Sequence, residues 1–384
     1  MKYLMILAVA ALFATTNAYS QELEPEDLVI DGIECTGNAL TDCEIIKREI
    51  YLNTGDKVNE EEIKNAKIRL QLLNLFKSVT LSLKKGAERG HVVLNVDVVE
   101  ESPLFSETSV SHSESSSLGT NDGLAFKLGH RNLFGKGKIL QGTFTRNGLT
   151  NSQDKTDSGT LEYLDPHLFG HKKYFLSASL SHFFINGSEN NGYLVAPKEY
   201  TTFAFSLGRR IFDFSHIGIG TIKSYWTQLG RNTTNESFYE TKYDSTAYTI
   251  NYGWNSEDDS YFPTEGSRFD LTYFKNENRN SYSTLTEFKQ NFSLNEKNIL
   301  SLQLQESFNS DFKNDHNAEL GLEWAYQLRR AQAGSAITDT RFFVKPSMNY
   351  STYSESFGKG VDAGVLVDTE SLGIIKFTTF YRGL

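Results

Sequence analysis

The sequence predicts a mainly β protein, a transmembrane antiparallel β-barrel of about 14–16 strands preceded by one α+β domain of order β-α-α-β-β. Stretches of about ten residues repeatedly alternate apolar and polar side chains, as expected of a barrel wall. Residues 261–274 show this best, because Phe269, Leu271 and Tyr273 alternate with polar residues after a turn. Helical periodicity is confined to the residues before Leu104.

The composition fits a barrel but does not by itself select one. The 384 residues are 39% hydrophobic and 13% aromatic, and the mean hydropathy of -0.41 is far below that of a helical membrane protein. A barrel wall needs only every second residue to be apolar, which keeps its average hydropathy low. A soluble sandwich or propeller would fit the same composition. After the N-terminus, no run approaches the roughly twenty apolar residues of a membrane-spanning helix.

The formal net charge is -10, from 38 Lys and Arg against 48 Asp and Glu. An acidic chain is a poor match for nucleic acid or for anionic lipid headgroups, because their phosphates attract basic patches. We therefore expect no nucleic-acid partner. The plainest interpretation of the acidic charge is solubility.

Residues 1–20 have the features of a secretory signal peptide. Lys2 gives the positively charged start, residues 4–14 form the apolar core, and small residues at 16–18 and 18–20 offer two cleavage sites. The apolar core is too short to span a bilayer. No cysteine follows either site, so a lipoprotein signal is not expected. We expect the mature protein to leave the cytoplasm.

Residues 21–103 form the predicted N-terminal domain. A strand at 28–35 leads into a helix that the capping box Thr41–Glu44 would open, and Asn59 would cap a second helix. Two alternating strands follow the second helix. The apolar side chains expected in the core of this domain include Ile45, Ile46, Ile50, Ile63, Ala66, Leu70 and Leu73.

The only two cysteines, Cys35 and Cys43, lie close together in this domain. In an oxidising compartment such a pair can form a disulfide that closes a short loop, which the loop-entropy model values at about 2–3 kcal/mol. Two buried thiols are the alternative. No histidine lies near them in sequence, so a metal site is not expected there.

Residues 104–384 form the predicted barrel, and the connections between its strands fall into two alternating classes. One class is long and hydrophilic, as expected of external loops, and comprises residues 113–121, 148–157, 187–199, 231–243 and 275–281. The other class is rich in Gly, Pro and Asp, as expected of tight periplasmic turns, and comprises residues 132–137, 165–170, 263–266 and 368–373. The turn residues of greatest interest are Gly135, Gly137, Asp165, Pro166, Pro263, Thr264 and Gly266.

The N-terminal domain resembles a POTRA domain over its full length. The matching pattern joins a Gly-Asn turn, a Gly-Asp turn, an apolar helix end and an alternating last strand. The resemblance implies a periplasmic, chaperone-like domain that binds extended client strands at a sheet edge, whose unpaired N–H and C=O groups accept another strand. A domain that only supports the barrel is the alternative. The residues that carry the match are Gly37, Asn38, Thr41, Gly55, Asp56, Leu73, Phe76, Val79, Val96, Val98, Glu100 and Pro103.

The turn sequences NLFGKG, DPHLFG and PTEGSRFDL, taken together, are similar to those of the BamA/TamA-type (bacterial surface antigen) outer-membrane barrel family. With the POTRA-like domain, the resemblance covers residues 27–384. It implies a barrel of the cell outer membrane that inserts or exports proteins through a seam between its first and last strands, here 105–111 and 374–384. The implied partners are unfolded outer-membrane or secreted client proteins, outer-membrane lipid, and periplasmic or membrane accessory proteins.

Three features depart from that family. Its Arg-Gly-aromatic motif in a long inward-folded external loop has no counterpart in residues 309–317, which form a short connection. Lys345 lies near the place where the family has an Asp on the partner strand. The strand count comes to about fifteen, because only one strand follows the turn at 368–373, whereas bacterial barrels usually have an even number.

No motif for catalysis or cofactor binding is present, so we expect no enzymatic activity, no metal and no cofactor. The sequence has no GxSxG, HExxH or Walker pattern. Residues 135–138 are interpreted as a turn, and His167 and His171 lack a third ligand. The predicted function is outer-membrane protein assembly or translocation. The alternatives are a passive outer-membrane channel or structural barrel without insertase activity, and a scaffold that holds a soluble partner at the membrane.

Overall fold

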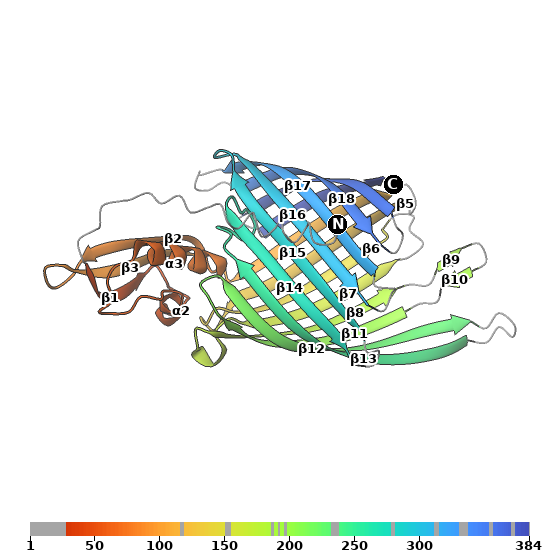
Figure 1. The fold of residues 1–384 in the computed structure, drawn as a ribbon, viewed down its shortest axis with the longest axis horizontal. Coiled ribbons are helices and arrows are strands. Elements are labelled where there is room, and N and C mark those ends of the chain that lie inside the picture. Colours follow the sequence, from red (N-terminus) through yellow and green to blue (C-terminus); the bar gives the residue numbers. More distant parts are fainter. Residues whose placement is uncertain are drawn as a thin grey trace.

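A small α+β domain lies at one mouth of a large β-barrel (Figure 1). We call this mouth the near mouth; residues 101–103 join the two parts of the chain. The signal peptide predicted at 1–20 lies outside the described residues, as do parts of the predicted external loops. The computed structural model describes residues 28–115, 119–149, 155–185, 188–190, 193–195, 198–231, 238–277, 281–310, 315–329, 337–352, 356–369 and 373–383.

The N-terminal domain has the predicted order of elements. These are β1 (Val29–Thr36), α2 (Cys43–Arg48), α3 (Glu60–Leu72), β2 (Phe76–Lys85) and β3 (His91–Glu100). β3 lies in the middle of the three-stranded sheet, parallel to β1 and antiparallel to β2. Neither helix is long and apolar enough to cross a membrane, and no other described helix is either.

The two helices pack on the sheet and enclose one apolar core. Ala66 and Leu70 lie one turn apart on α3 and are fully buried, which is why this helix docks by that stripe. Truncating a side chain as well buried as Leu70 to alanine costs about 2–5 kcal/mol of stability. The core consists of Ile30, Ile45, Ile46, Ile50, Leu52, Ala66, Leu70, Leu75, Phe76, Val79, Leu94, Val96 and Val98, with Ile63 and Leu73 partly buried against it.

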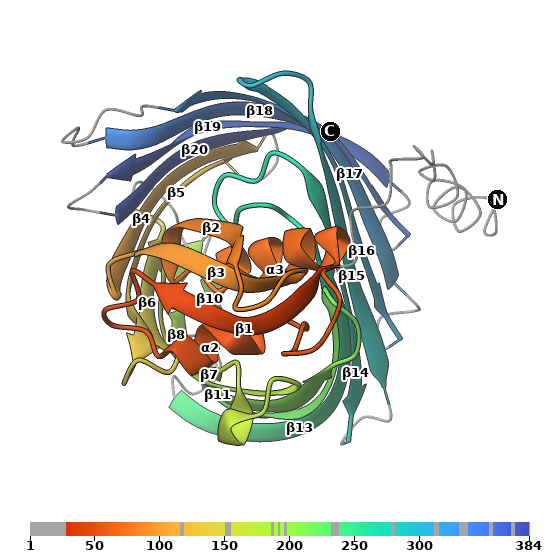
Figure 2. The same ribbon diagram turned by 90° about the vertical axis from the view of Figure 1, so that its left-hand side faces the viewer.

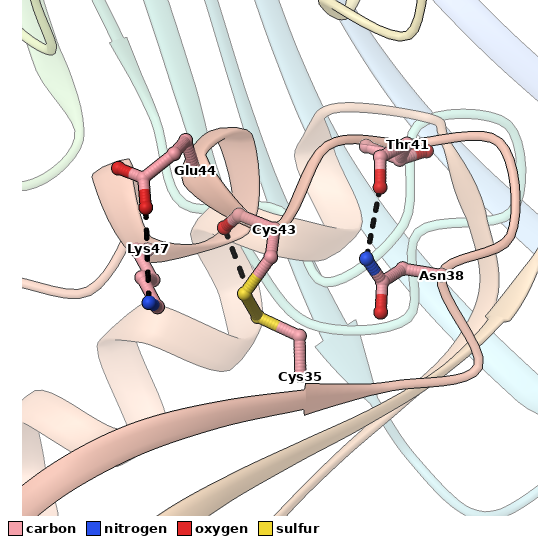
Figure 3. Close-up of a disulfide and its surroundings, with 6 residues drawn as sticks. All are labelled: Cys35, Asn38, Thr41, Cys43, Glu44 and Lys47. Carbon is pink, nitrogen blue, oxygen red and sulfur yellow. Dashed lines mark hydrogen bonds and ion pairs between the residues drawn. A yellow bond between two sulfur atoms is a disulfide. The ribbon is translucent and has the colours of Figure 1, made fainter.

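The two predicted helix caps have different outcomes. Asn59 caps α3 as expected, because its side chain accepts a hydrogen bond of 3.1 Å from the backbone N–H of Glu62. The capping box expected at Thr41–Glu44 is wrong: the N-cap of α2 is Asp42, without a side-chain cap bond. Glu44 instead pairs with Lys47 at 3.7 Å (Figure 3).

Tertiary contacts explain the missing capping box. The Glu100 carboxylate, at the end of β3, accepts hydrogen bonds from the backbone N–H groups of Leu40 and Thr41 at 2.8 and 2.7 Å. The Thr41 hydroxyl accepts a bond of 2.9 Å from the Asn132 side chain of the barrel. Glu100 and Asn132 therefore already bond to the backbone N–H and the hydroxyl of Thr41, and neither group is available for a capping box.

Among the described residues, the barrel wall is a closed ring of fifteen strands. Two short strands, β9 (Ser188–Asn190) and β10 (Tyr193–Val195), form a separate hairpin beyond the wall (Figure 1). The wall strands are β4 (Leu104–Ser115), β5 (Gly119–Leu133), β6 (Lys138–Asn147), β7 (Thr156–Asp165), β8 (Tyr174–Ile185), β11 (Lys198–Arg210), β12 (Ser215–Arg231), β13 (Phe238–Asn255), β14 (Gly266–Asn276), β15 (Tyr282–Ser293), β16 (Asn298–Asn309), β17 (Asp315–Arg329), β18 (Ile337–Ser351), β19 (Ser356–Thr369) and β20 (Gly373–Gly383).

The odd strand count changes one part of the predicted fold. Neighbouring strands are antiparallel around the ring, but the closing pair of β20 and β4 is parallel. This follows from the count, since a fifteen-strand meander brings its first and last strands together in the same direction. The closing pair is therefore the one departure from the predicted antiparallel pairing, and the described strands close the ring.

Apolar side chains cover the outer face of the wall. Phe269, Leu271 and Tyr273 of β14 share a face with Ile250 of β13, which is half exposed. The opposite face of β14 contributes Arg268 to a polar cavity inside the barrel. Apolar side chains facing out and charged side chains facing in are the pattern of a barrel surrounded by lipid.

Two predicted external loops are shorter than expected. Of residues 113–121, only 116–118 lie between β4 and β5. β13 begins at Phe238, inside the connection predicted at 231–243, so β12 and β13 continue as a long hairpin beyond the rest of the wall (Figure 1). Trp226 of β12 stacks on Tyr243 of β13 with their ring centroids 4.0 Å apart. Aromatic pairs across two strands stabilise a hairpin, which explains why the strands continue into the segment predicted as a loop.

Candidate functional site

The near mouth brings the N-terminal domain against three barrel turns. Figure 2 looks toward this mouth and shows α2 and α3 in front of the ring of strands. The contacting turns lie between β5 and β6, between β7 and β8, and between β11 and β12. We call this set of contacts the domain junction.

The turn between β5 and β6 contacts the segment that precedes α2. The Gly135 carbonyl accepts a hydrogen bond of 3.1 Å from the Asp42 N–H. Within the turn, the side-chain oxygen of Asn132 accepts a hydrogen bond of 2.8 Å from the Gly137 N–H. Gly135 and Gly137 have φ values of 70° and 67°. A Cβ on Gly135 would lie 2.7 Å from the Leu40 carbonyl oxygen. Gly135 is therefore required by both its backbone conformation and its close approach to the domain.

Glu49 is the centre of the domain junction. It follows α2, and its side chain is only 1% exposed. His167, in the turn after β7, contacts a carboxylate oxygen through Nε2 at 2.7 Å. Arg210, at the end of β11, donates from Nη1 to both carboxylate oxygens at 2.7 and 2.8 Å. One buried carboxylate thus joins the domain to two separate barrel turns.

The charge of Glu49 is stabilised by these two partners. Burial on its own would raise the pKa of the carboxyl group. The nearby positive charge of Arg210 and the hydrogen bond from His167 outweigh burial and lower the pKa from 4.5 to about 2. Glu49 is therefore ionised across the physiological range, as a buried carboxylate can be only when it is paired.

Arg69 extends the domain junction along α3. Its Nε donates a hydrogen bond of 2.8 Å to the Glu49 carbonyl oxygen, and its Nη2 pairs with Glu62. Its Nη1 lies 3.5 Å from a carboxylate oxygen of Asp213, in the turn between β11 and β12. The Asn65 side chain donates to the same Asp213 at 3.2 Å. Helix α3 is thereby attached to the barrel beside Glu49.

Asp165 and Pro166 shape the turn that carries His167. The Asp165 carboxylate, 4% exposed, accepts a hydrogen bond of 3.1 Å from the His167 N–H and pairs with Lys138 at 3.1 Å. Pro166 lines a cavity between the domain and the barrel. These two predicted turn residues therefore position the histidine that contacts Glu49.

The residues of the POTRA-like pattern hold the N-terminal domain together. Gly37 has a φ of 81°, and a Cβ there would lie 1.9 Å from the Val98 carbonyl oxygen. The Asn38 side chain donates to the Thr41 carbonyl at 2.9 Å (Figure 3). The remaining members are structural too: Gly55 has a φ of 93°, Asp56 accepts a bond of 2.7 Å from the Asn53 N–H, and Phe76 and Val79 are buried in the core.

Cys35 and Cys43 form a disulfide in the structure (Figure 3). It joins the end of β1 to the first residue of α2, with 5.8 Å between the two Cα atoms. In the loop-entropy model, so short a loop stabilises the folded domain by about 2–3 kcal/mol. The bond holds the start of the helix whose other end presents Glu49.

The third predicted turn, 263–266, differs from the expectation of a tight turn. Pro263 and Thr264 belong to a connection of ten residues, 256–265, between β13 and β14. Gly266 has a φ of 94°, and a Cβ there would lie 2.1 Å from the Ser256 carbonyl oxygen. We call residues 256–265 the inner loop, because Tyr261 lines the cavity inside the barrel.

The barrel closes where the predicted seam lies. Nine residues of β20, Ile374 to Arg382, pair with Glu107 to Ser115 of β4. It is the one parallel pair in the described barrel, and parallel pairing is slightly weaker per residue than antiparallel pairing. The turn expected at 368–373 leads into β20, although residues 370–372 lie outside the described ranges.

Within the described ranges, no group of three His, Cys, Asp or Glu side chains could hold a metal ion. His167 and His171 share a turn, but His167 is committed to Glu49 and His171 contacts the ring of Tyr174. The near mouth therefore joins the two domains through hydrogen bonds and ion pairs.

Comparison with known proteins agrees with this architecture. Residues 28–101 match the POTRA family model, described as "Surface antigen variable number repeat". No curated protein matches the chain in sequence. A structure of BamA from Haemophilus ducreyi lacking POTRA domains 1–3 is 15% identical, with 92% of this chain and 81% of that chain covered and a TM-score of 0.46.

Two CdiB structures are similar in fold. CdiB from Escherichia coli and CdiB from Acinetobacter baumannii are each 12% identical to this chain with a TM-score of 0.59. Both alignments cover 90% of this chain, with 70% of the first CdiB chain and 69% of the second. The chain thus has a POTRA domain, which the family model matches, followed by a closed barrel whose fold is similar to that of the CdiB structures.

Proposed function

We propose that this protein is a non-enzymatic factor of the outer membrane that inserts or exports other proteins. In this proposal the POTRA domain receives unfolded outer-membrane or secreted clients, and the barrel passes them to the seam between β4 and β20. The observation that carries the proposal is the POTRA domain attached through buried Glu49 to the mouth of a barrel whose first and last strands meet in a parallel pair.

The two ends of the barrel support a periplasmic position for the POTRA domain. At the near mouth the connections between β5 and β6 and between β15 and β16 are four residues each. At the far end β12 and β13 extend as a long hairpin. Outer-membrane barrels have short turns on the periplasmic side and longer loops outside, and these three connections support a near mouth that faces the periplasm.

The open edge of the POTRA sheet is the proposed client site. The outer edge of β1 is already occupied near its start, because the backbone of Ile30 exchanges hydrogen bonds with Gly55 and Asp56. Among the described residues, no strand pairs with the outer edge of β2. An extended client could add a strand there through its backbone groups. The POTRA domain would then hold the client next to the near mouth.

A photo-crosslinking experiment tests the client site. A photoreactive amino acid at Thr80 or Ser82, both exposed on β2, is expected to capture nascent outer-membrane or secreted proteins in cells. The matched control is Lys67, exposed on α3 in the same domain. Depletion of the protein should also lower the levels of outer-membrane barrels or surface proteins. Normal levels of both classes after depletion would contradict the proposal.

A passive channel is the second candidate, and the connection between β16 and β17 favours it. Asn309 pairs with Asp315, so this external connection is too short to fold deep into the barrel as a lid. Conductance of the purified protein in planar bilayers separates the two functions. A large, steady pore supports the channel, whereas rare and irregular openings support the assembly or translocation factor.

A further inference from the structure

We propose that the inner loop, residues 256–265, is the barrier that closes the barrel lumen on the POTRA side. This inference rests on the proposed function in one respect, because the lumen is then part of the client route. The barrier itself is a property of the barrel and is measured without a client. Its evidence comes from where the inner loop reaches and how it is held.

The inner loop crosses the lumen. It leaves the wall between β13 and β14 and reaches Arg341 of β18, which bonds to the Pro263 carbonyl oxygen. Glu107, Lys127 and Arg131 of β4 and β5 lie near Tyr261. In the ring of fifteen strands, β4 and β5 lie on the side opposite β13 and β14. Tyr261 also lines a cavity of about 440 Å³ whose other walls are strands β14 to β20. The loop therefore lies between the near mouth and this cavity.

Arg341 attaches the inner loop to the wall. This β18 residue is 3% exposed, and its Nη2 donates a hydrogen bond of 2.5 Å to the Pro263 carbonyl oxygen and one of 3.1 Å to the Gln327 side chain. Its guanidinium carbon lies 6.0 Å from the ring centroid of Phe262, which is 6% exposed. A charged donor on the wall thus holds the tip of the loop across the opening.

The inner loop keeps its own shape through two aspartates. The Asp258 carboxylate accepts bonds from the Thr264 N–H at 2.7 Å, the Thr264 hydroxyl at 2.6 Å and the Glu265 N–H at 3.1 Å. Asp259 accepts from the N–H groups of Tyr261 and Phe262, both at 2.8 Å. The loop is a preformed unit with its own internal bonds and few bonds to the far wall, so it can move as one body.

The base of the inner loop is fixed to the neighbouring strands β15 and β16. Glu257, 5% exposed, accepts a hydrogen bond of 2.8 Å from the Asn291 side chain, and Asn291 accepts one of 2.7 Å from Ser301. The backbone N–H of Ser256 donates to the Ser267 carbonyl at 2.9 Å. A fixed base and a tip held by Arg341 are the parts of a hinged barrier.

Conductance of the purified full-length protein in planar bilayers tests the barrier. In Asp258→Ala the loop loses the three bonds that the Asp258 carboxylate accepts, without any change in a residue that lines the cavity. In Arg341→Lys the wall keeps its charge but loses the guanidinium fork. Each variant is expected to spend about tenfold more time open, since hydrogen bonds to charged groups of this kind are worth at least tenfold in population. Replacing residues 258–264 by Gly-Asn should give a steadily open pore.

The matched control is Asn295→Ala. Asn295 shapes the turn between β15 and β16 at the same mouth, through bonds to the N–H groups of Lys297 and Asn298, both at 3.0 Å, and it does not line the cavity. This control should conduct like the natural protein. Folding of every variant is checked by the mobility shift of an unheated barrel in a detergent gel.

The loop-shortened variant decides the outcome. If it folds and conducts no more than the natural protein, the inner loop is not the barrier. If the shortened variant fails to fold, folded Asp258→Ala and Arg341→Lys decide in its place, and natural conductance in both overturns the proposal. Normal client levels after depletion, together with an open shortened variant, would reject the proposed function and leave the barrier in place.

Discussion

Arg210 of the barrel donates hydrogen bonds of 2.7 and 2.8 Å to the two carboxylate oxygens of Glu49 in the POTRA domain. The carboxylate is 1% exposed and the guanidinium side chain is 22% exposed. These residues lie 161 positions apart in the sequence, and their pairing sets how the POTRA domain sits at the near mouth. The first two predictions concern this pair.

Substituting either partner is expected to loosen the POTRA domain from the barrel. Glu49→Gln leaves Arg210 without its counter-ion, and Arg210→Gln leaves a buried carboxylate with His167 alone. Losing one member of a buried pair costs about 3–5 kcal/mol, which corresponds to a rise of about 100-fold or more in amide exchange of residues 165–171. Hydrogen–deuterium exchange of the full-length protein measures this rise.

The double variant sharpens the same measurement. Because both charges are removed together, it should exchange less than the sum of the two single effects predicts, by a coupling of about 0.5–3 kcal/mol. Glu34→Gln is the control, since Glu34 and Lys84 form an exposed pair at 3.8 Å. Single variants that exchange no faster than this control would show that the pair does not hold the domains together.

Docking of the POTRA domain should depend on acid pH. Glu49 has a pKa of about 2 when docked, against an ordinary value of 4.5. Because the docked pKa is lowered, the ion pair stabilises docking fully above pH 4.5 and loses this contribution as the pH falls toward 2. The difference is worth about 3 kcal/mol at neutral pH.

Exchange of residues 165–171 at pH 7, 5, 3 and 2, corrected for the intrinsic rate at each pH, measures this dependence. The natural protein should lose protection below pH 4.5. Glu49→Gln should be weakly protected throughout, with no further loss in this window. An identical pH profile for the two proteins would contradict the assignment of the acid response to Glu49.

Gly135→Ala is expected to weaken the contact between the β5–β6 turn and the POTRA domain. A non-glycine residue in the left-handed region costs about 1–2 kcal/mol, and the added Cβ would lie 2.7 Å from the Leu40 carbonyl oxygen. Gly159→Ala in β7 is the matched control, because no atom lies within 4 Å of its added Cβ. Denaturant unfolding in detergent should show a loss for Gly135→Ala only, and equal midpoints would contradict it.

The sequence predicts much of the fold because local patterns determine it. Alternation places Phe269 and Leu271 on the outer face, and the 3.6-residue period places Ala66 and Leu70 in the POTRA core. The odd strand count implies that β4 and β20 close the ring in parallel, as they do. The alternation and the helical period depend on neighbours in the chain, and the closure follows from counting the strands, so a pattern can show all three.

The domain junction and the inner loop depend on residues that are distant in sequence. Glu49 and His167 are 118 positions apart, and nothing in the local sequence of either one indicates a buried partner. A Pro-Thr-Glu-Gly turn has the same composition whether it is tight or folds inward. The sequence around Pro263 therefore does not indicate that Arg341 binds its carbonyl oxygen. Thr41 and Glu44 have the spacing of a capping box, but Glu100 takes the free N–H groups first.

Locking the seam tests whether clients leave the barrel between β4 and β20. Ser111 and Thr378 face each other across it, so Ser111→Cys with Thr378→Cys would form a disulfide there. The control pair, Ser109→Cys with Ala125→Cys, would join β4 to β5 instead. The measurement is the amount of newly assembled or exported client protein in cells that carry each oxidised variant.

The locked seam should stop client assembly or export, while the control pair should support it at the natural level. Full client assembly with the seam pair completely oxidised would show that the seam does not open, and would contradict the proposed function at its main step.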